Sequence, residues 1–143
     1  MSNVAQVIQD KVERTIFTIS PESTVLEAIS LMADKGIGAL VVTVEDKVVG
    51  ILSERDYTRK VILMERTSKE TTVSEIMTSK VLTVTKSTTV EDSLSLMTDR
   101  HLRHLPVLEN EKLIGLISIG DLVKAVMDDQ RKLIDQLQQY IAS

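Results

Sequence analysis

Short apolar runs alternate with amphipathic segments along the chain, which is the pattern of strands interleaved with helices. A β-rich run stops at the Ser20-Pro21 turn, and Thr24-Val-Leu-Glu27 has the form of a capping box that opens a helix. A continuous apolar run at residues 39–44 is typical of a strand buried on both faces. The first half therefore predicts a strand at 16–19, a helix from Thr24 to Gly36, strands at 39–44 and 48–52, and a helix from Ser53 to about Arg66.

The same order of elements recurs 65 residues later in the chain, without a gap. The second half predicts strands at 81–84, 105–108 and 113–117, with helices that start at Thr89 and Ser118. Each β-α-β-β-α unit is too small to bury its own apolar face. We therefore expect an α/β (α+β) fold, in which two tandem repeats pack on each other about a pseudo-twofold axis. Identical residues at this offset include Thr18/Thr83, Met32/Met97, Leu40/Leu105, Val42/Val107, Gly50/Gly115, Ser53/Ser118 and Asp56/Asp121.

Three segments flank or link the repeats, which occupy residues 15–66 and 80–128. Residues 1–14 carry Val4, Ile8 and Val12 on one face of a predicted helix. Residues 67–79 form a linker rich in Ser, Thr and charge, and the capping box Thr72-Val-Ser-Glu75 starts a short helix in it. Residues 129–143 extend the last helix with an apolar stripe that must pack against another surface. That surface could be the N-terminal helix, a second subunit or an effector. The heptad positions of this stripe are Met127, Gln130, Ile134, Leu137 and Ile141.

Composition narrows the function classes. The 143 residues include no Cys, which excludes disulfides, thiolate nucleophiles and zinc-cysteine sites. The net charge of −4 argues against a nucleic-acid partner, and no stretch reaches the roughly 18 apolar residues that a membrane span needs. The N-terminus lacks the apolar run of a secretory signal, so we expect a cytoplasmic protein.

Catalytic and metal-binding patterns are also missing from the sequence. It contains no Gly-x-Ser-x-Gly elbow, no Walker loop and no recurring carboxylate pair. Its two His residues, His101 and His104, have no carboxylate at a ligand spacing with both. We therefore expect neither an enzyme nor a metal site.

Each repeat joins a strand to its last helix through the same element, Gly-x-x-Ser-x-x-Asp. Free N–H groups at a helix start form an anion site together with the helix dipole, and Ser53 and Ser118 add a hydroxyl there. One turn further, Asp56 and Asp121 can each accept two hydrogen bonds from a ribose diol. The elements therefore indicate a phosphorylated ribose. The alternative is an ordinary N-cap with an acidic first turn.

Both halves resemble CBS domains, and the pair resembles a Bateman module, over about residues 15–128. Small bacterial proteins that consist only of a CBS pair are the most similar. The resemblance implies that Ser contacts phosphate, that Asp contacts ribose hydroxyls, and that apolar residues at Ile16, Val41, Val81 and Pro106 sandwich adenine. The motifs that carry it are Gly50-Ile-Leu-Ser53-Glu-Arg-Asp56, Gly115-Leu-Ile-Ser118-Ile-Gly-Asp121, Ile76-Met-Thr78 and His104-Leu-Pro-Val107.

Three basic residues are candidates for contact with phosphate. Arg55 lies in a first helical turn, where the dipole disfavours a cation, so its position indicates either phosphate binding or a solvated side chain that pairs with an acidic neighbour. The resemblance implies that Arg103 and His104 reach phosphates across the cleft. The alternative for His104 is a half-buried strand histidine, and His101 fits a helix C-terminus.

The sequence thus predicts a regulatory module that reversibly binds an adenosine-type nucleotide, without catalysis. AMP, ADP, ATP or NAD would bind in the cleft between the repeats, and a homodimer or a partner protein would transmit the signal. The alternative is a structural dimerisation or interaction module with no nucleotide ligand. Melting in the presence of nucleotide separates the two.

Overall fold

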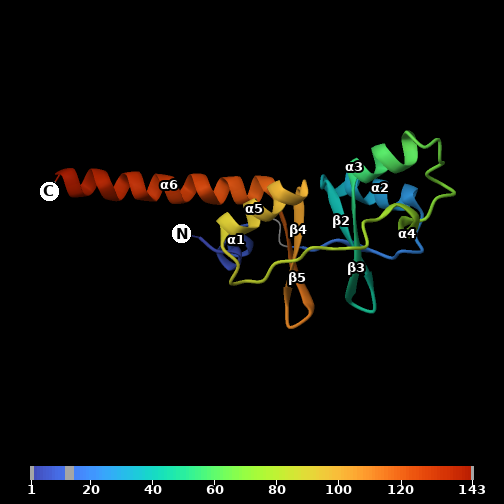
Figure 1. The fold of residues 1–143 in the computed structure, drawn as a ribbon, viewed down its shortest axis with the longest axis horizontal. Helices are drawn as coiled ribbons and strands as arrows, with labels where there is room; N and C mark the ends of the chain where they lie inside the picture. Colours follow the sequence, from blue (N-terminus) through green and yellow to red (C-terminus); the bar gives the residue numbers. More distant parts are fainter. Residues whose placement is uncertain (1, 12–14, 143) are drawn as a thin grey trace. The chain divides into compact units, whose positions relative to one another are not determined.

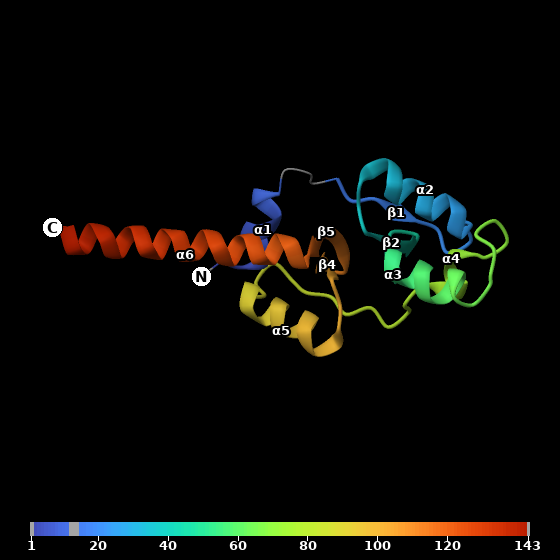
Figure 2. The same ribbon diagram turned by 90° about the horizontal axis from the view of Figure 1, so that it is seen from above.

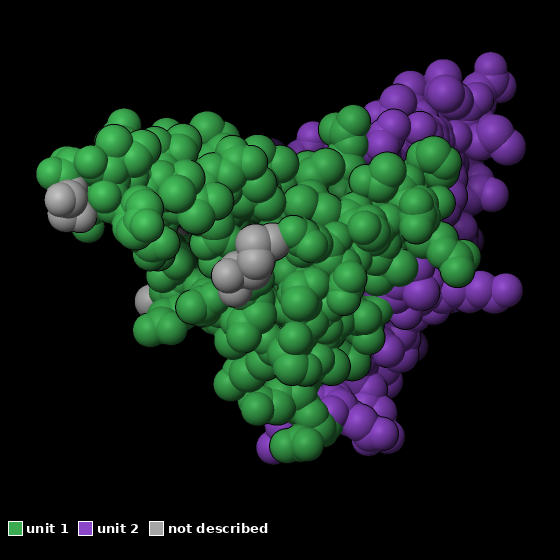
Figure 3. Space-filling view, turned by 60° about the vertical axis from the view of Figure 1, so that its left-hand side comes forward, with its two compact units in different colours: residues 1–15, 83–110, 114–143 green, residues 16–82, 111–113 purple. Residues whose placement is uncertain are grey.

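The computed structural model describes residues 2–11 and 15–142. They form two compact units (Figure 3): unit 1 contains Met1–Thr15, Thr83–Asn110 and Ile114–Ser143, and unit 2 contains Ile16–Leu82 and Glu111–Leu113. Each unit is built around one repeat. The predicted class, mixed α and β with two tandem β-α-β-β-α repeats, is confirmed. None of the helices in the described part of the chain is long and apolar enough to cross a membrane.

Unit 2 holds the first repeat, around a three-stranded sheet of order β1-β2-β3. β1 pairs parallel with β2, and β2 pairs antiparallel with β3 through a turn at Glu45 and Asp46, whose φ angles are 50° and 65°. The buried core gathers apolar side chains from α2, β2, β3, η1 and α4. The elements, shown in Figure 1, are β1 (Thr18–Ile19), α2 (Val25–Lys35), β2 (Ala39–Val44), β3 (Lys47–Ser53), α3 (Glu54–Tyr57), the π-helix η1 (Thr58–Ile62) and α4 (Val73–Ile76).

Unit 1 holds the second repeat, around the two-stranded β4-β5 sheet. Its last helix, α6, is 24 residues long and joins the predicted repeat helix and the predicted C-terminal extension into one element. Figure 2 shows α1 lying beside α6. The elements are α1 (Val4–Asp10), α5 (Val90–Arg100), β4 (His104–Glu109), β5 (Lys112–Ser118, of which Lys112 and Leu113 are assigned to unit 2) and α6 (Ile119–Ala142). Val12, predicted on the apolar face of the first helix, lies outside the described residues.

The helix that precedes each repeat in the sequence packs on the other repeat. α1 precedes repeat 1, yet the Val4 N–H donates to the Thr88 carbonyl (2.9 Å) and Val4 is fully buried in unit 1. α4 precedes repeat 2, yet the Val25 N–H donates to the Thr71 carbonyl (2.8 Å) just before it, and Ile76 lies in the core of unit 2. Each sheet thus receives its covering helix from a distant part of the chain.

Several predicted elements have the expected bounds. The strand at 39–44 is β2, and the helix that begins after Thr24 ends at Gly36, whose φ of 64° is the left-handed conformation that glycine adopts readily. The Thr24 hydroxyl accepts the Glu27 N–H (3.2 Å), as an N-cap does. In the linker, the Glu75 carboxylate accepts the Thr72 N–H (3.0 Å), which agrees with the predicted helix start.

The predicted helix from Ser53 to Arg66 is wrong at its C-terminal end. It continues from α3 through the π-helix η1 only to Ile62, and Glu65 then adopts a left-handed φ of 58°. The chain must turn back here because carbonyl oxygens of the following segment accept the free N–H groups at the start of α2. The Ser68 carbonyl, for example, accepts the Leu26 N–H (2.9 Å).

The predicted strand at 81–84 is reduced to a single bridge between Val84 and Val107. Val84 donates to the Pro106 carbonyl (3.1 Å) and accepts from the Leu108 N–H (2.9 Å). The next rung of this parallel ladder would need an N–H at Pro106, which proline lacks. In repeat 1 the matching residue is Val41, and there the ladder extends to Thr18.

Candidate functional site

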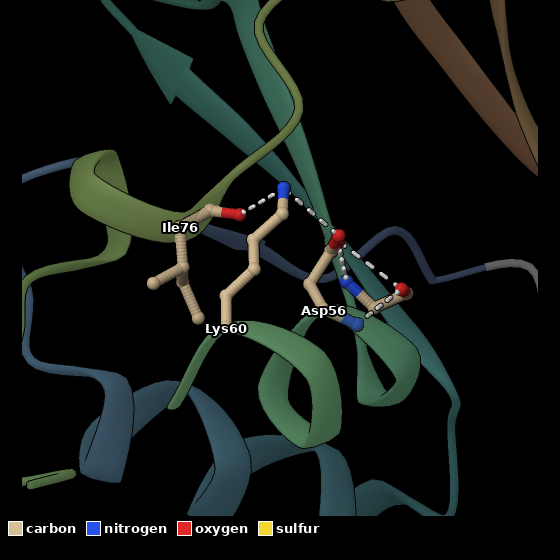
Figure 4. Close-up of polar contacts among 4 residues, drawn as sticks. Asp56, Lys60 and Ile76 are labelled. Atoms are coloured by element: carbon tan, nitrogen blue, oxygen red, sulfur yellow. Dashed lines mark hydrogen bonds and ion pairs between the residues drawn. The ribbon is translucent and has the colours of Figure 1, made fainter. Parts of the chain in front are cut away.

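In repeat 1, the Ser-x-x-Asp element lies at the junction of β3 and α3. Asp56 Oδ2 accepts the Ser53 N–H (2.9 Å) and the Ser53 hydroxyl (3.1 Å), and the Ser53 Oγ accepts the Asp56 N–H (3.2 Å). Lys60, one turn along, contacts Asp56 Oδ1 (3.3 Å) and donates to the Ile76 carbonyl (2.9 Å), as Figure 4 shows. Both carboxylate oxygens of Asp56 are therefore engaged within the repeat.

In repeat 2, the same element lies at the junction of β5 and α6. Asp121 Oδ2 accepts the Ser118 N–H (2.8 Å), and the Ser118 Oγ accepts the Asp121 N–H (3.1 Å). The ammonium group comes from Lys11, whose Nζ lies 3.0 Å from the same Oδ2 and donates to the Leu116 carbonyl (2.7 Å). No described residue donates a hydrogen bond to Oδ1 of Asp121, so this oxygen remains available as an acceptor.

The free N–H groups expected at these helix starts are mostly used internally. The Ser and Asp N–H groups complete the caps, and the next N–H in each repeat donates to a carbonyl: Glu54 to Gly38 (3.1 Å), and Ile119 to Arg103 (2.9 Å). Among the described residues, only the N–H groups of Arg55 and Gly120 lack an acceptor in the first turns. The predicted backbone anion site is therefore smaller than the sequence suggested, and phosphate binding would depend mainly on side chains.

Charge and burial set the ionisation of the repeat-2 cluster. Burial opposes ionisation of Asp121, but the Ser118 N–H and the Lys11 ammonium outweigh it and lower the pKa of Asp121 below its ordinary value. Burial lowers the pKa of His104, and the charges of Lys11 and Arg103 add to this effect while Asp121 opposes it. His104 is therefore neutral near pH 7, where it can offer phosphate a hydrogen bond but no charge.

The remaining predicted site residues divide between the two units. Arg55 and Arg103 are exposed, and Arg103 directly precedes β4. Ile16 and Val81 are half-buried outside the strands, whereas Val41 in β2 and Pro106 in β4 are buried. Unit 2 therefore holds Ile16, Val41, Ser53, Arg55, Asp56 and Val81, and unit 1 holds Arg103, His104, Pro106, Ser118 and Asp121.

Sequence reasoning missed the two lysines that contact the carboxylates. Lys60 could have been found, because it follows Asp56 by four residues on a helix and such residues are neighbours. Lys11 could not, because it lies 105 residues from the carbonyl it binds at Leu116. No group of three or more His, Cys, Asp or Glu side chains that could hold a metal ion occurs in the part of the chain that the structure describes.

The sequence matches the family model for the CBS domain over residues 4–62 and 73–128, and each matched segment begins at a preceding helix, α1 or α4. The CBS domain-containing protein CBSX3, mitochondrial, of Arabidopsis thaliana is 42% identical over 125 residues, which are 84% of this chain and 61% of that protein. The CBS domain-containing protein YhcV of Bacillus subtilis (strain 168) is 29% identical over 123 residues, 86% of this chain and 87% of that one.

Solved structures agree with these sequence matches. A protein with CBS domains from Burkholderia ambifaria MC40-6 is 54% identical and superposes with a TM-score of 0.87, covering 90% of this chain and 96% of its own. The family model spans both repeats, and the same repeat order is present in the structure. The chain therefore belongs to the CBS domain family and carries a tandem pair of these domains.

Proposed function

We propose that this chain reversibly binds an adenosine-type nucleotide, AMP, ADP, ATP or NAD, at its Ser-x-x-Asp elements and acts as a regulatory module without catalysis. The observation that carries the proposal is one constellation that occurs twice. In each repeat a Ser N–H orients an Asp carboxylate at a helix start, and a lysine ammonium lies against that carboxylate. A fixed carboxylate can accept ribose hydroxyls, and the ammonium offsets its repulsion of a phosphate.

The two Ser-x-x-Asp elements differ in how accessible they are, and the element of repeat 2 is more open to a ligand. Asp121 retains an oxygen that accepts no hydrogen bond from the described residues, whereas both oxygens of Asp56 are occupied. The repeat-2 helix α6 is 24 residues long, while α3 has four residues before the π-helix. A Cβ at Gly120 would meet only the Ser118 Oγ, at 3.7 Å, so the backbone at the start of α6 is open to a ligand. We therefore propose that repeat 2 binds first.

A more distant CBS pair supports the adenosine class of ligand. The CBS domain pair of protein MJ0100 was solved in complex with 5′-methylthioadenosine and S-adenosyl-L-methionine, and it shares this fold with a TM-score of 0.79 at 20% identity. Both ligands contain adenosine. In the present chain, the positive charges of Lys11, which contacts Asp121, and of Arg103, which acts on His104, favour a phosphorylated ligand over these two.

Calorimetric titration with AMP, ADP, ATP, NAD and S-adenosyl-L-methionine tests the proposal. We expect at least one nucleotide to bind and to raise the melting temperature, since a ligand that binds only the native state stabilises it. Asp121→Ala should weaken that binding by about tenfold or more, because it removes hydrogen bonds to a charged acceptor. If no nucleotide binds at millimolar concentration, the elements are helix caps and the proposal is wrong.

A second function, self-association, is favoured by the C-terminal half of α6. Residues 131–142 are exposed along their whole length, and Leu133, Ile134 and Leu137 are 56%, 53% and 53% exposed. Figure 1 shows this part of α6 extending away from the rest of unit 1. We propose that the chain forms a homodimer, and that this function persists if no nucleotide binds. Sedimentation equilibrium at tens of micromolar should give about twice the 15.9 kDa chain mass, and a monomer would contradict it.

A further inference from the structure

Polar contacts at two places hold the N-terminal segment, residues 2–11, against α6. At one end, the Ser2 N–H and hydroxyl donate to the Asp129 carboxylate at 3.0 and 2.6 Å. At the other end, Lys11 contacts Asp121 (3.0 Å) and the Leu116 carbonyl (2.7 Å). Between them α1 buries Val4 and Val7 against the second repeat. The anchor nearer the start of α6 is therefore the same side chain that neutralises the candidate ribose acceptor.

Lys11 and Asp121 also border open space. A groove of about 290 Å³ runs between α1 and α6, and both side chains line it. Their side chains are 26% and 25% exposed, so the pair is shielded enough to hold one geometry yet open on the groove side. Oδ1 of Asp121, which accepts no hydrogen bond from the described residues, is the oxygen left for a ligand hydroxyl.

In repeat 1, the charge of the carboxylate is balanced by a residue of the same repeat. Its ammonium group is that of Lys60, on the turn that follows Asp56, so the carboxylate keeps its partner whatever the rest of the chain does. The residue that matches Lys60 in repeat 2 is Ala125, which cannot replace it. In repeat 2 the Lys11 ammonium reaches the carboxylate only while the N-terminal segment is docked on α6.

We propose that Lys11 is a positioning residue of the repeat-2 nucleotide site, and that docking of the N-terminal helix α1 and nucleotide binding at Asp121 are therefore coupled. The inference rests on the proposed function. With Lys11 in place, Asp121 is oriented and its charge is balanced beside an incoming phosphate. Without Lys11, a bare carboxylate repels the phosphate and loses one of the contacts that orient it.

The coupling works in both directions. If docking of α1 strengthens nucleotide binding, nucleotide binding strengthens docking of α1 by the same factor. The state of the N-terminal segment would then report whether the site is filled. Because a charge-balancing ammonium affects phosphate more than a neutral ribose, the coupling should be larger for AMP than for adenosine.

The experiment combines calorimetry with hydrogen exchange on the full chain, with AMP, ATP and adenosine as probes. Lys11→Ala should raise the Kd of the nucleotide by about tenfold, and that of adenosine by less, as expected for a lost charged hydrogen-bond partner. Lys11→Arg should restore part of the affinity. Lys124→Ala is the matched control, since Lys124 lines the same groove without contacting Asp121, and it should change the Kd by less than about twofold.

Amide exchange in α1 gives the second readout. In the wild type, nucleotide should slow exchange of the α1 amides, and this slowing should disappear in Lys11→Ala. Asp121→Asn should speed α1 exchange even without nucleotide, because it removes the anchor from the other side. A circular dichroism melt of each variant shows that the fold is retained.

The outcomes separate the inference from the proposed function. If neither AMP nor ATP binds the wild type, the proposed function fails and this inference fails with it. If nucleotide binds but Lys11→Ala binds it as well as the wild type does, only the inference is overturned. Nucleotide binding that leaves α1 exchange unchanged in the wild type would also overturn it, since a coupled site cannot bind without acting on the segment.

Discussion

Replacing Asp121 by Asn removes the charge of the repeat-2 carboxylate while keeping an oxygen that can accept the Ser118 N–H. The lost interactions are the Lys11 ion pair and the favourable position of a negative charge in the first turn of α6. The pair is about one quarter exposed (26% and 25%), so it should contribute somewhat more than an exposed pair, about 1 kcal/mol. The helix dipole adds about 0.3–1 kcal/mol.

Asp121→Asn should therefore lower the free energy of unfolding by about 1–2 kcal/mol at neutral pH, and the melting temperature by about 3–6 °C. Urea unfolding followed by circular dichroism measures the first quantity. Asp128→Asn is a matched control, because Asp128 lines the same groove and its ion pair among the described residues is a long one, 3.8 Å, to the exposed Arg131. We expect the control to stay within about 0.5 kcal/mol of the wild type.

The pH dependence follows from the lowered pKa of Asp121. A carboxylate with a lowered pKa stabilises the fold above its ordinary pKa of 3.8, and this contribution is lost as the pH falls through the lower pKa of the folded state. The difference between the wild type and Asp121→Asn should be constant from about pH 7 to 8 and should shrink below about pH 4. Between these ranges it should grow, because Asn also removes the charge that favours protonated His104, so the pKa of His104 falls further below its ordinary value in the variant. A difference that is absent at pH 7, or that does not shrink below pH 4, would refute the reasoning.

Three further predictions concern the core and the ligand. Gly50→Ala should cost about 1–3 kcal/mol by urea unfolding, because the new Cβ would strike the Met77 sulfur and lie 3.2 Å from the Thr78 carbonyl, which cannot move aside. Leu40→Ala should cost about 2–5 kcal/mol in the same assay, since Leu40 is fully buried in β2, and a smaller loss would mean that the core collapses around the gap. Arg103→Ala should reduce the ratio of the adenosine Kd to the AMP Kd in calorimetry. It should leave the melting temperature unchanged, because Arg103 is exposed. An unchanged ratio of the two Kd values would mean that Arg103 lies outside the site.

Local patterns in the sequence were sufficient for the type of most elements. The apolar run at 39–44 and the helix that Gly36 ends both depend on neighbouring residues only, so periodicity and turn chemistry predict their bounds. The repeat of these patterns also predicted the second unit. The loss of the strand before Val84 had a local cause as well, since Pro106 stands in the sequence where the ladder needs an N–H.

The sequence locates the Ser-x-x-Asp elements and their side chains, but it does not show which of their backbone groups are free to bind a ligand. The sequence shows that Ser118 and Asp121 lie one helical turn apart. It does not show that the neighbouring Ile119 N–H donates to the Arg103 carbonyl, because that bond joins the start of α6 to the residue before β4. The size of the anion site depends on this pairing, which is why the number of free N–H groups was overestimated.

Only the tertiary structure decided which helix covers which sheet and which ammonium balances Asp121. α1 is adjacent in sequence to repeat 1, and neither helix propensity nor hydrophobic periodicity predicts that it packs on repeat 2. Burial of Val4 and Val7 and the hydrogen bonds of Ser2 determine that choice, and they bring Lys11 to a carboxylate more than a hundred residues away. Contacts between distant segments depend on the sum of packing over the whole unit, whereas a helix or a strand depends mainly on its own few residues.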